Sequence, residues 1–316
     1  MRVFVCEFVT GGGLRKGPLP PSLAREGLMM RDALVSDLLD LGVDVLMAHD
    51  DRTRAPYGAE SVSVAPGDSV WRLWADLASA CDVAWVVAPE TGGLLAKLTR
   101  VVRDSGARVI GPDDETIRIA SSKTLTASKL AAFVLTPPVW RPGEVPVDRA
   151  GPFVAKPDDG AGCEDTRMMT AAPTKTQLPK GHIVQPFVPG DAASLTVLRV
   201  EGRTRLLSAN RQRIVVENGA FRFRGVGVAA LEDRDGRFVA VAEAVVAALP
   251  GLSGIFGIDL VLGEDGPVVI EVNPRLTTAY AGLRDALGFN PAALVPPFSA
   301  AVCAPAAAPR HVEIAL

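Results

Sequence analysis

Residues 257–275 carry the side chains whose types and spacing could do chemistry. The stretch reads GIDLVLGEDGPVVIEVNPR and contains Asp259, Glu271 and Asn273. Two runs of alternating residues flank a glycine-containing loop at residues 264–266, which is typical of an antiparallel hairpin. A loop centred there sets Asp259 opposite Glu271, and side-chain alternation puts Asn273 on the same face.

This arrangement predicts a cation site at one face of the hairpin. Two facing carboxylates repel each other and need a compensating charge. Their hard oxygen atoms suit Mg²⁺ or Mn²⁺. Arg275 follows the strand as a fixed donor for phosphate or carboxylate. The alternative is a solvated acidic edge. The opposite face is expected to be pure core and consists of Ile258, Leu260, Leu262, Val268, Ile270 and Val272.

Composition fits a globular protein of two domains, or of one domain with subdomains. The chain has 316 residues, a net charge of −3, 48% hydrophobic residues and only three histidines. It has no block of Lys and Arg, so we expect no nucleic-acid partner. We also expect no membrane segment or signal peptide, and a cytoplasmic location. The four cysteines are far apart and predict free thiols: Cys6, Cys81, Cys163 and Cys303.

Residues 1–112 alternate between strand and helix patterns, which predicts an open sheet of parallel βαβ units. Apolar strand runs occur at Val3–Val9 and Val83–Ala88. Ligands gather at the carboxyl ends of such strands, where Thr10–Gly13 and Glu90 follow. Glu90 is therefore a candidate to face a substrate. The glycine run either approaches a ligand or only forms a turn, and it lacks the dinucleotide-binding fingerprint.

From Asp113 the pattern changes. One helix is expected over Glu115–Phe133, and it bears Lys123. A strand with Lys156 precedes a loop containing Gly160, Ala161 and Gly162. A lysine is a compact charge for phosphate oxygens, and glycine-rich backbone presents N–H groups to the same ligand. A surface lysine before a tight turn is the alternative.

The second half of the chain reads as a mixture of strands and helices. A short strand at 183–188 is followed by a meander with strands at 195–200, 203–210, 214–217 and 220–225. A helix is expected at Arg237–Ala248, then the hairpin. A last helix begins near Leu283, and a loose tail is expected at Ala304–Pro309.

From about Asp113 onward, the order of these elements resembles the ATP-grasp superfamily of carboxylate–amine ligases. Four motifs in series carry the resemblance: Lys123, Lys156 with its glycine loop, residues 185–188, and Asp259 with the Glu271–Arg275 run. The resemblance implies an α/β (α+β) chain. Its units would be an open parallel N-terminal domain over 1–112 and two ATP-clasping subdomains over 113–184 and 185–316.

The resemblance also implies how ATP is held. Lys123 and Lys156 would hold the α- and β-phosphates, and the glycine loop would close over the β/γ end. Asp191 would reach the ribose. The adenine would bind the backbone of Gln185, Pro186, Phe187 and Val188.

Metal ions and the reacting group are assigned in the same way. Asp259, Glu271 and Asn273 would hold Mg²⁺ (or Mn²⁺), and Arg275 would steady the phosphoryl or acyl-phosphate group. The family often has an arginine two residues before the first metal aspartate. Here that position is Gly257, so Arg211 or Arg275 would compensate.

Within the superfamily, the chain resembles the tyramine–glutamate ligases of methanofuran-type cofactor biosynthesis. Short stretches in both halves carry this closer resemblance: 6–12, 26–30, 88–90, 192–194, 210–212 and 273–278. Besides Glu90, it implies further candidate substrate contacts, namely Ser194, Arg211, Thr277, Thr278 and Tyr280.

The leading hypothesis is a ligase in which a carboxylate, the glutamate γ-carboxyl, attacks ATP and an amine then displaces phosphate from the acyl phosphate. A phosphotransferase on the same fold and a non-catalytic nucleotide-binding protein remain alternatives, and a nicotinamide-dependent dehydrogenase is the weakest. The expected partners are small-molecule substrates, and a homodimer is the working expectation for the assembly.

Overall fold

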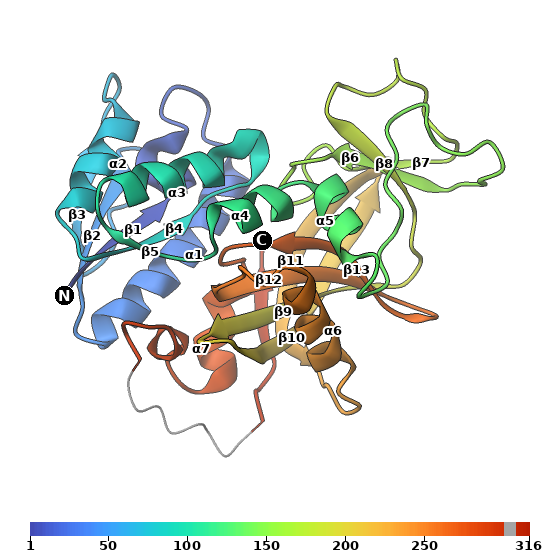
Figure 1. Cartoon of the computed structure of the whole chain (residues 1–316). Coiled ribbons are helices and arrows are strands. Elements are labelled where there is room, and N and C mark those ends of the chain that lie inside the picture. Colours follow the sequence, from blue (N-terminus) through green and yellow to red (C-terminus); the bar gives the residue numbers. More distant parts are fainter. Residues whose placement is uncertain (300–307) are drawn as a thin grey trace.

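The computed structural model describes residues 1–299 and 308–316, and its first unit is a parallel sheet with helices against it (Figure 1). The strand order is β3-β2-β1-β4-β5, and every pairing is parallel. The strands are β1 (Arg2–Glu7), β2 (Asp44–Asp50), β3 (Glu60–Val64), β4 (Val83–Val87) and β5 (Arg108–Ile110). The helices are α1 (Pro21–Asp40), α2 (Val70–Ser79) and α3 (Leu94–Asp104). The predicted βαβ sheet is confirmed.

The sequence analysis misses β3 because its pattern is weak. This edge strand reads ESVSV, and of its five residues only Val64 is buried. A polar edge strand lacks the apolar run that marks β4, all five residues of which are buried.

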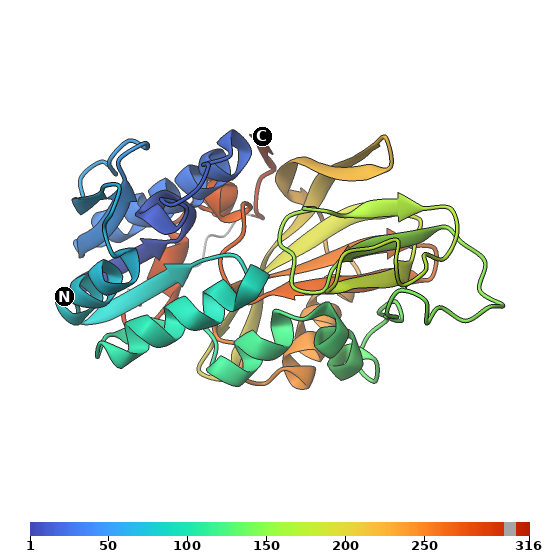
Figure 2. The same cartoon turned by 90° about the horizontal axis from the view of Figure 1, so that it is seen from above.

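The second unit is an antiparallel sheet ordered β13-β12-β9-β10-β11-β7-β6-β8, with β14 paired to β11. Figure 2 shows this sheet beside the first unit, with the helices α3, α4 and α5 running along one side of the molecule. The first strands are β6 (Phe153–Pro157), β7 (Arg167–Met169), β8 (His182–Pro186), β9 (Asp191–Val200) and β10 (Arg203–Glu217). The others are β11 (Ala220–Leu231), β12 (Gly254–Gly263), β13 (Gly266–Asn273) and β14 (Val312–Ala315).

One weak junction divides this sheet. The strands β6, β7 and β8 pair with one another, but β7 joins β11 through a single residue pair, Ala220 with Arg167. The division into 1–112, 113–184 and 185–316 stays a proposal. The chain crosses this junction between β8 and β9, at residues 187–190, whereas the proposed boundary at 184/185 falls within β8.

The single helix predicted over Glu115–Phe133 is wrong, because the chain forms α4 (Asp114–Ala120) and α5 (Lys123–Leu130). The break lies at Ser122, which is extended at φ −118° and ψ 118°. Its side chain accepts a hydrogen bond from the N–H of Leu125 and so caps the second helix. Lys123 thereby becomes the first residue of α5.

One further expectation needs correction. The predicted strands at 203–210 and 214–217 are one long strand, β10, which is interrupted only by register shifts. Of the loose tail expected at Ala304–Pro309, residues 304–307 lie outside the described residues. The ordered strand β14 follows and pairs with residues 225–228 of β11.

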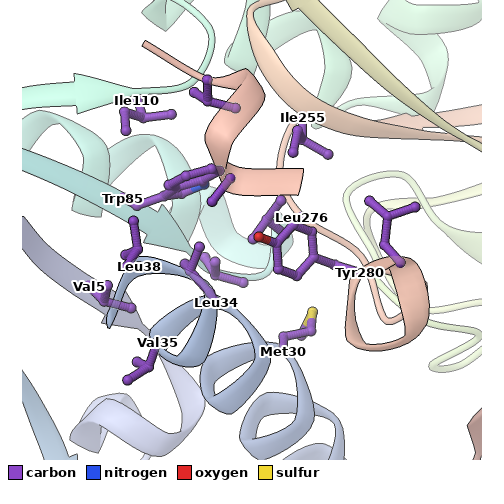
Figure 3. Close-up of a cluster of buried hydrophobic side chains, with 14 of the residues drawn as sticks. Val5, Met30, Leu34, Val35, Leu38, Trp85, Ile110, Ile255, Leu276 and Tyr280 are labelled. Atoms are coloured by element: carbon purple, nitrogen blue, oxygen red, sulfur yellow. The ribbon is translucent and has the colours of Figure 1, made fainter. Parts of the chain in front are cut away.

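The remaining helices cover the second sheet or join the units. They are α6 (Arg237–Ala248), α7 (Tyr280–Leu287) and the short turns η1 (Val9–Gly13), η2 (Thr91–Gly93) and η3 (Pro291–Leu294). One buried cluster joins α1 to α7 and to both sheets, as Figure 3 shows with Met30, Leu34, Trp85, Ile255 and Tyr280. This core fixes the two units against each other. Among the described residues, no helix combines the length and apolarity that crossing a bilayer requires.

Candidate active site

A cavity of about 880 Å³ lies where the two units meet. Its wall includes the carboxyl ends of β1 and β4, as the sequence predicts for ligand sites on a parallel sheet. The opposite wall comes from α5, β6, β12, β13 and the segment between β8 and β9. The separated motifs of the sequence analysis therefore converge on one space.

The hairpin supplies the acidic side of this cavity. The predicted register is confirmed, with Asp259 paired to Glu271. Asn273 Nδ2 donates to Asp259 Oδ2 at 3.1 Å, and Gln212 Nε2 donates to Asp259 Oδ1 at 2.9 Å. Each Asp259 oxygen thus has a fixed orientation.

A β-bulge follows this pair and changes the predicted core face. The register shifts between Asp259 and Leu260, so Leu260 faces Val269. Val269 is fully buried in the core, and Ile270 lines the cavity. The assignment of Val268 and Ile270 to the core is therefore wrong. The other predicted core residues do pack there: Ile258, Leu260, Leu262 and Val272.

The charges of two lysines act on Glu271. Lys123 Nζ lies 3.0 Å from Glu271 Oε2 and donates to the carbonyl oxygen of Gly160 at 2.6 Å. Burial by itself would raise the pKa of Glu271, but the charges of Lys123 and Lys156 hold it below its ordinary value. Burial and the neighbouring Glu271 charge raise the pKa of Asp259. Burial lowers the pKa of Lys156 to about 8, although Glu271 opposes this shift.

Asp259, Glu271 and Asn273 fit a divalent cation whose coordination shell is completed by oxygen atoms of a bound ligand. The described residues contain no cluster of three or more His, Cys, Asp or Glu side chains that could hold a metal ion. Two carboxylates and an amide match Mg²⁺, which typically takes one or two carboxylates plus substrate phosphates.

Asp158 fixes the start of α5. Its Oδ1 accepts from the N–H of Thr124 at 2.8 Å, and its Oδ2 accepts from Ser122 Oγ at 2.6 Å. The carbonyl oxygen of Asp158 also accepts from the N–H of Lys123 at 2.9 Å. Lys123 therefore enters the cavity from a helix end that is anchored to the residue after β6.

The glycine loop after β6 lies along the cavity wall. Gly160, Ala161 and Gly162 all line it, and Gly162 has φ +64°, in the left-handed region that favours glycine. Beside the loop, Asp159 Oδ2 accepts from the N–H of Gly92 at 2.8 Å. This contact ties the loop to the N-terminal unit.

An apolar slot lies near the end of β8. Pro186, Phe187 and Val188 line it from one segment, and Ile270 lines the cavity as well. The N–H of Phe187 is already used, since it donates to the Pro152 oxygen at 2.9 Å. Gln185 is buried, and its Nε2 has no partner within the described chain. A flat aromatic ring with polar edges suits such a slot.

Asp191 and Arg211 form an ion pair at the edge of the cavity. Arg211 NH1 donates to Asp191 Oδ2 at 2.5 Å, and both side chains are at least half exposed. Both residues line the cavity. Asp191 and Arg211 therefore both lie at the cavity, where each is the ion-pair partner of the other.

Arg275 and Glu90 form a buried ion pair between the two units. Arg275 NH2 donates to Glu90 Oε2 at 2.8 Å, and Glu90 is only 4% exposed. Arg275 Nε and Glu90 Oε1 have no hydrogen-bond partner in the part of the chain that the structure describes. At Gly257, an added Cβ would lie 2.5 Å from Thr277 Cγ2, so a larger residue at this position would require Thr277 to shift. Arg275 is the buried arginine of the cavity.

Three predicted substrate contacts also line the cavity, namely Ser194, Thr277 and Thr278. Ser194 Oγ accepts from Asn210 Nδ2 at 3.3 Å. Thr278 Oγ1 donates to Glu26 Oε2 at 3.1 Å. The hydroxyl of Thr278 therefore links the segment after β13 to helix α1.

Tyr280 is not at the cavity, so its assignment as a substrate contact is wrong. It is the first residue of α7, where its ring is 1% exposed in the core of Figure 3. Its hydroxyl donates to Asp37 Oδ2 at 2.7 Å, and Arg284 NH1 donates to Asp37 Oδ1 at 3.2 Å. Tyr280 instead holds α7 against α1 and so supports the Thr278–Glu26 contact.

This internal aspartate makes stability depend on pH. Burial raises the pKa of Asp37 from 3.8 to about 6, so its contribution is fully present below 3.8 and is lost as the pH rises through about 6. We expect the difference in unfolding free energy between wild type and Asp37→Asn to fall by about 2–3 kcal/mol between pH 4 and pH 7. Denaturant titrations across this range measure it. A difference that is independent of pH would contradict the assignment.

The sequence analysis missed two residues of the site. Gln212 binds Asp259, but the predicted break in β10 left its face unassigned. Glu26 lines the cavity from α1. It lies four residues before Met30 and three after Leu23, so helical spacing could have placed it on the same face.

Comparisons with known proteins agree with this architecture. A family profile described as an ATP-grasp domain matches residues 120–279, and one described as a pre ATP-grasp 3 domain matches residues 43–117. The tyramine–L-glutamate ligase of Methanocaldococcus jannaschii is 26% identical over 268 residues, which cover 83% of this chain and 80% of that protein. The same enzyme from Methanocaldococcus fervens is 25% identical, covering 83% of this chain and 84% of that protein.

Solved structures share the fold. An ATP-grasp superfamily protein from Archaeoglobus fulgidus superposes with a TM-score of 0.75 at 24% identity, covering 100% of this chain and 99% of that chain. The L-amino acid ligase of Bacillus licheniformis has a TM-score of 0.62 at 17% identity, covering 92% of this chain and 71% of that one.

Proposed function

Because the chain belongs to the ATP-grasp family, we propose that it is an ATP- and Mg²⁺-dependent ligase that joins a carboxylate to an amine. The observation that carries this proposal is the grouping of Glu271, two lysines and Arg275 in one cavity. The two curated relatives, at 26% and 25% identity, suggest the finer assignment. In it, the carboxylate is the glutamate γ-carboxyl and the amine is tyramine or a related aryl-ethylamine.

ATP would occupy the half of the cavity next to the second sheet. The apolar slot at Gln185, Pro186, Phe187 and Val188 suits the adenine, and the buried Gln185 amide is a spare donor near it. Asp191 is the ribose candidate at the edge. The phosphates would lie along the glycine loop, against Lys123 and Lys156.

Asp259, Glu271 and Asn273 would hold Mg²⁺ on the phosphates. Its chemistry is neutralisation of the charge that grows on the transferring phosphoryl group. Lys123 and Lys156 would contribute to the same neutralisation, and the ion pair with Lys123 fixes the position of Glu271. Phosphoryl transfer depends on such positioning and electrostatics more than on a protein nucleophile.

The chemistry has two steps. In the first, a carboxylate oxygen of the donor bonds to the γ-phosphorus and the bond to ADP breaks, which gives an acyl phosphate and ADP. In the second, the amine nitrogen bonds to the acyl carbon, the C–O bond to phosphate breaks, and the amine loses a proton. Arg275 lies between the two units and would steady the acyl-phosphate oxygens, with Glu90 fixing its orientation. Ser194, Arg211, Thr277 and Thr278 are the further substrate candidates.

The cavity extends well beyond the space next to the phosphate-binding side. Apolar residues of the N-terminal unit line the rest, which gives room for a second organic substrate. This feature favours a ligase over a phosphotransferase, although both reactions begin with the same phosphoryl transfer.

The position of Lys123 provides a test of the ATP site. Asp158→Ala removes the hydrogen bonds that anchor the start of α5. We expect a loss of about 1 kcal/mol in unfolding free energy and a rise of about tenfold in the KM for ATP. Asp148→Ala, at an exposed loop residue, is the control. An unchanged KM for ATP would show that Lys123 does not depend on this anchor.

The proposed function is tested by ADP release with Mg-ATP, L-glutamate and a panel of amines including tyramine, with product masses measured. The proposal requires release that depends on both glutamate and an aryl-ethylamine, with the mass of their amide. Release with glutamate alone and a stable phosphorylated product would indicate a phosphotransferase. Binding of ATP without release under any pairing would indicate a nucleotide-binding protein.

A further inference from the structure

The part of the cavity beside α1 is an apolar compartment. Its wall includes Leu14, Pro18, Leu23, Met30, Phe223 and Val226. These residues come from the segment after η1, from α1 and from β11, so both units contribute. Burying apolar surface is the main source of affinity that such a wall offers.

The segment after η1 is held in place. Arg52 NH1 donates to the carbonyl oxygen of Gly17 at 2.8 Å, and Arg52 NH2 donates to that of Leu14 at 3.0 Å. Arg52 itself is fixed by the fully buried Asp50, which accepts from its Nε at 2.8 Å. This side of the compartment is therefore formed before a ligand binds.

Two carboxylates reach the cavity beside α1, and one of them is already engaged: Glu7 accepts from the N–H groups of Val9 and Thr10 and from Thr10 Oγ1. The other is Glu26. Glu26 lines the cavity from α1, three residues after Leu23 and four before Met30. Its Oε2 accepts from Thr278 Oγ1 at 3.1 Å, whereas its Oε1 has no hydrogen-bond partner within residues 1–299 and 308–316. No lysine or arginine of the described residues forms an ion pair with it. Burial raises the pKa of the Glu26 carboxyl, so a cationic ligand that paired with it would offset its desolvation.

We propose that Glu26 binds the ammonium group of the acceptor amine, while the apolar compartment holds the hydrocarbon or aromatic part of the same molecule. This inference rests on the proposed ligase function and names the acceptor class, an amine with an apolar substituent. The Thr278 hydroxyl orients the carboxylate. Arg275, whose charge acts on Glu26, is the residue assigned to the acyl phosphate, so the amine nitrogen is held on the side of the reacting carbon. The bound ammonium gives one proton to solvent before its nitrogen attacks that carbon.

The other possible source of an ammonium is the α-amino group of the donor amino acid. Such a donor also carries an α-carboxylate. The cation whose charge reaches Glu26 is Arg275, which is paired with Glu90 and assigned to the acyl phosphate, and the wall beside Glu26 is apolar, with Leu23 and Met30. An amine with an apolar body satisfies both features of the compartment, so the geometry favours the acceptor.

The test is steady-state kinetics of Glu26→Gln, which keeps the shape and removes the charge. We expect the KM for tyramine to rise about 10- to 100-fold, as for the loss of a charged hydrogen bond. The KM values for glutamate and ATP should change by no more than about twofold, which is under 0.5 kcal/mol. Glu243→Gln, at an exposed position on α6, is the matched control. A rise in the KM for glutamate instead would assign Glu26 to the donor and overturn the proposal.

Hydroxylamine separates this proposal from the proposed function. It is small and largely uncharged near neutral pH, and it converts an acyl phosphate into a hydroxamate and phosphate without needing either the carboxylate or the apolar wall. In Glu26→Gln the ratio of tyramine amide to hydroxamate should fall at least about tenfold. An unchanged ratio would overturn the role of Glu26. If wild type forms neither product from glutamate, the ligase proposal itself fails.

Discussion

Glu271→Gln is expected to lower turnover by about 10³-fold while the protein stays folded. Glu271 is the acidic partner of Lys123 and the residue paired with Asp259 across the hairpin. The amide keeps the size of the side chain but cannot neutralise the lysines or supply an anionic oxygen to Mg²⁺. The phosphates of ATP would then face two lysines without their carboxylate partner and a weakened cation site. We therefore expect ATP to bind with its γ-phosphate out of position for phosphoryl transfer.

The control is Glu264→Gln, an exposed residue in the turn of the same hairpin. It makes the same chemical change without touching the cavity, so its turnover should equal that of wild type. Circular dichroism and thermal unfolding establish that both variants are folded. Near-normal turnover of Glu271→Gln with Mg²⁺ would refute the metal assignment.

Arg275→Met is expected to lower both stability and turnover. The pair with Glu90 is buried, and removal of one partner leaves an uncompensated charge, which costs about 3–5 kcal/mol. Turnover should fall by about 10²- to 10³-fold, because the charge that we assign to the acyl-phosphate group is gone. Denaturant unfolding and amide formation measure the two effects separately.

The double variant Glu90→Gln/Arg275→Met distinguishes these effects. It removes both charges, so most of the lost stability should return while turnover stays low. Arg118→Met, which removes an exposed ion pair on α4, should change neither quantity measurably. If turnover recovered together with stability in the double variant, Arg275 would be a structural residue only.

Local patterns in the sequence predicted much of the fold and of the acidic centre. The alternation around residues 264–266 gave the correct register of Asp259 with Glu271, since a short loop fixes the pairing of its strands. The parallel N-terminal sheet followed from its apolar runs. The break at Ser122 was missed because helical periodicity continues across it, although a serine before Lys123 and Thr124 is a common capping residue.

What the sequence could not predict depends on contacts between distant segments. The β-bulge after Asp259 exchanges the faces of Val269 and Ile270, and alternation alone assumes a regular strand. Glu90 and Arg275 are 185 residues apart, and their pairing requires both units to be in place. Tyr280 follows the Thr277–Thr278 segment, but the first turn of α7 carries it to Asp37 in the core. The apolar compartment likewise combines α1 with β11.

The central claim is that the carboxylate is activated as an acyl phosphate, and isotope transfer tests it most directly. Glutamate labelled with a heavy oxygen isotope in its γ-carboxyl would be incubated with Mg-ATP and tyramine, and the phosphate released would be analysed by mass. The account predicts that each phosphate released with an amide carries one labelled oxygen from the carboxylate, because the C–O bond breaks in the second step. Amide formation with unlabelled phosphate would contradict the account.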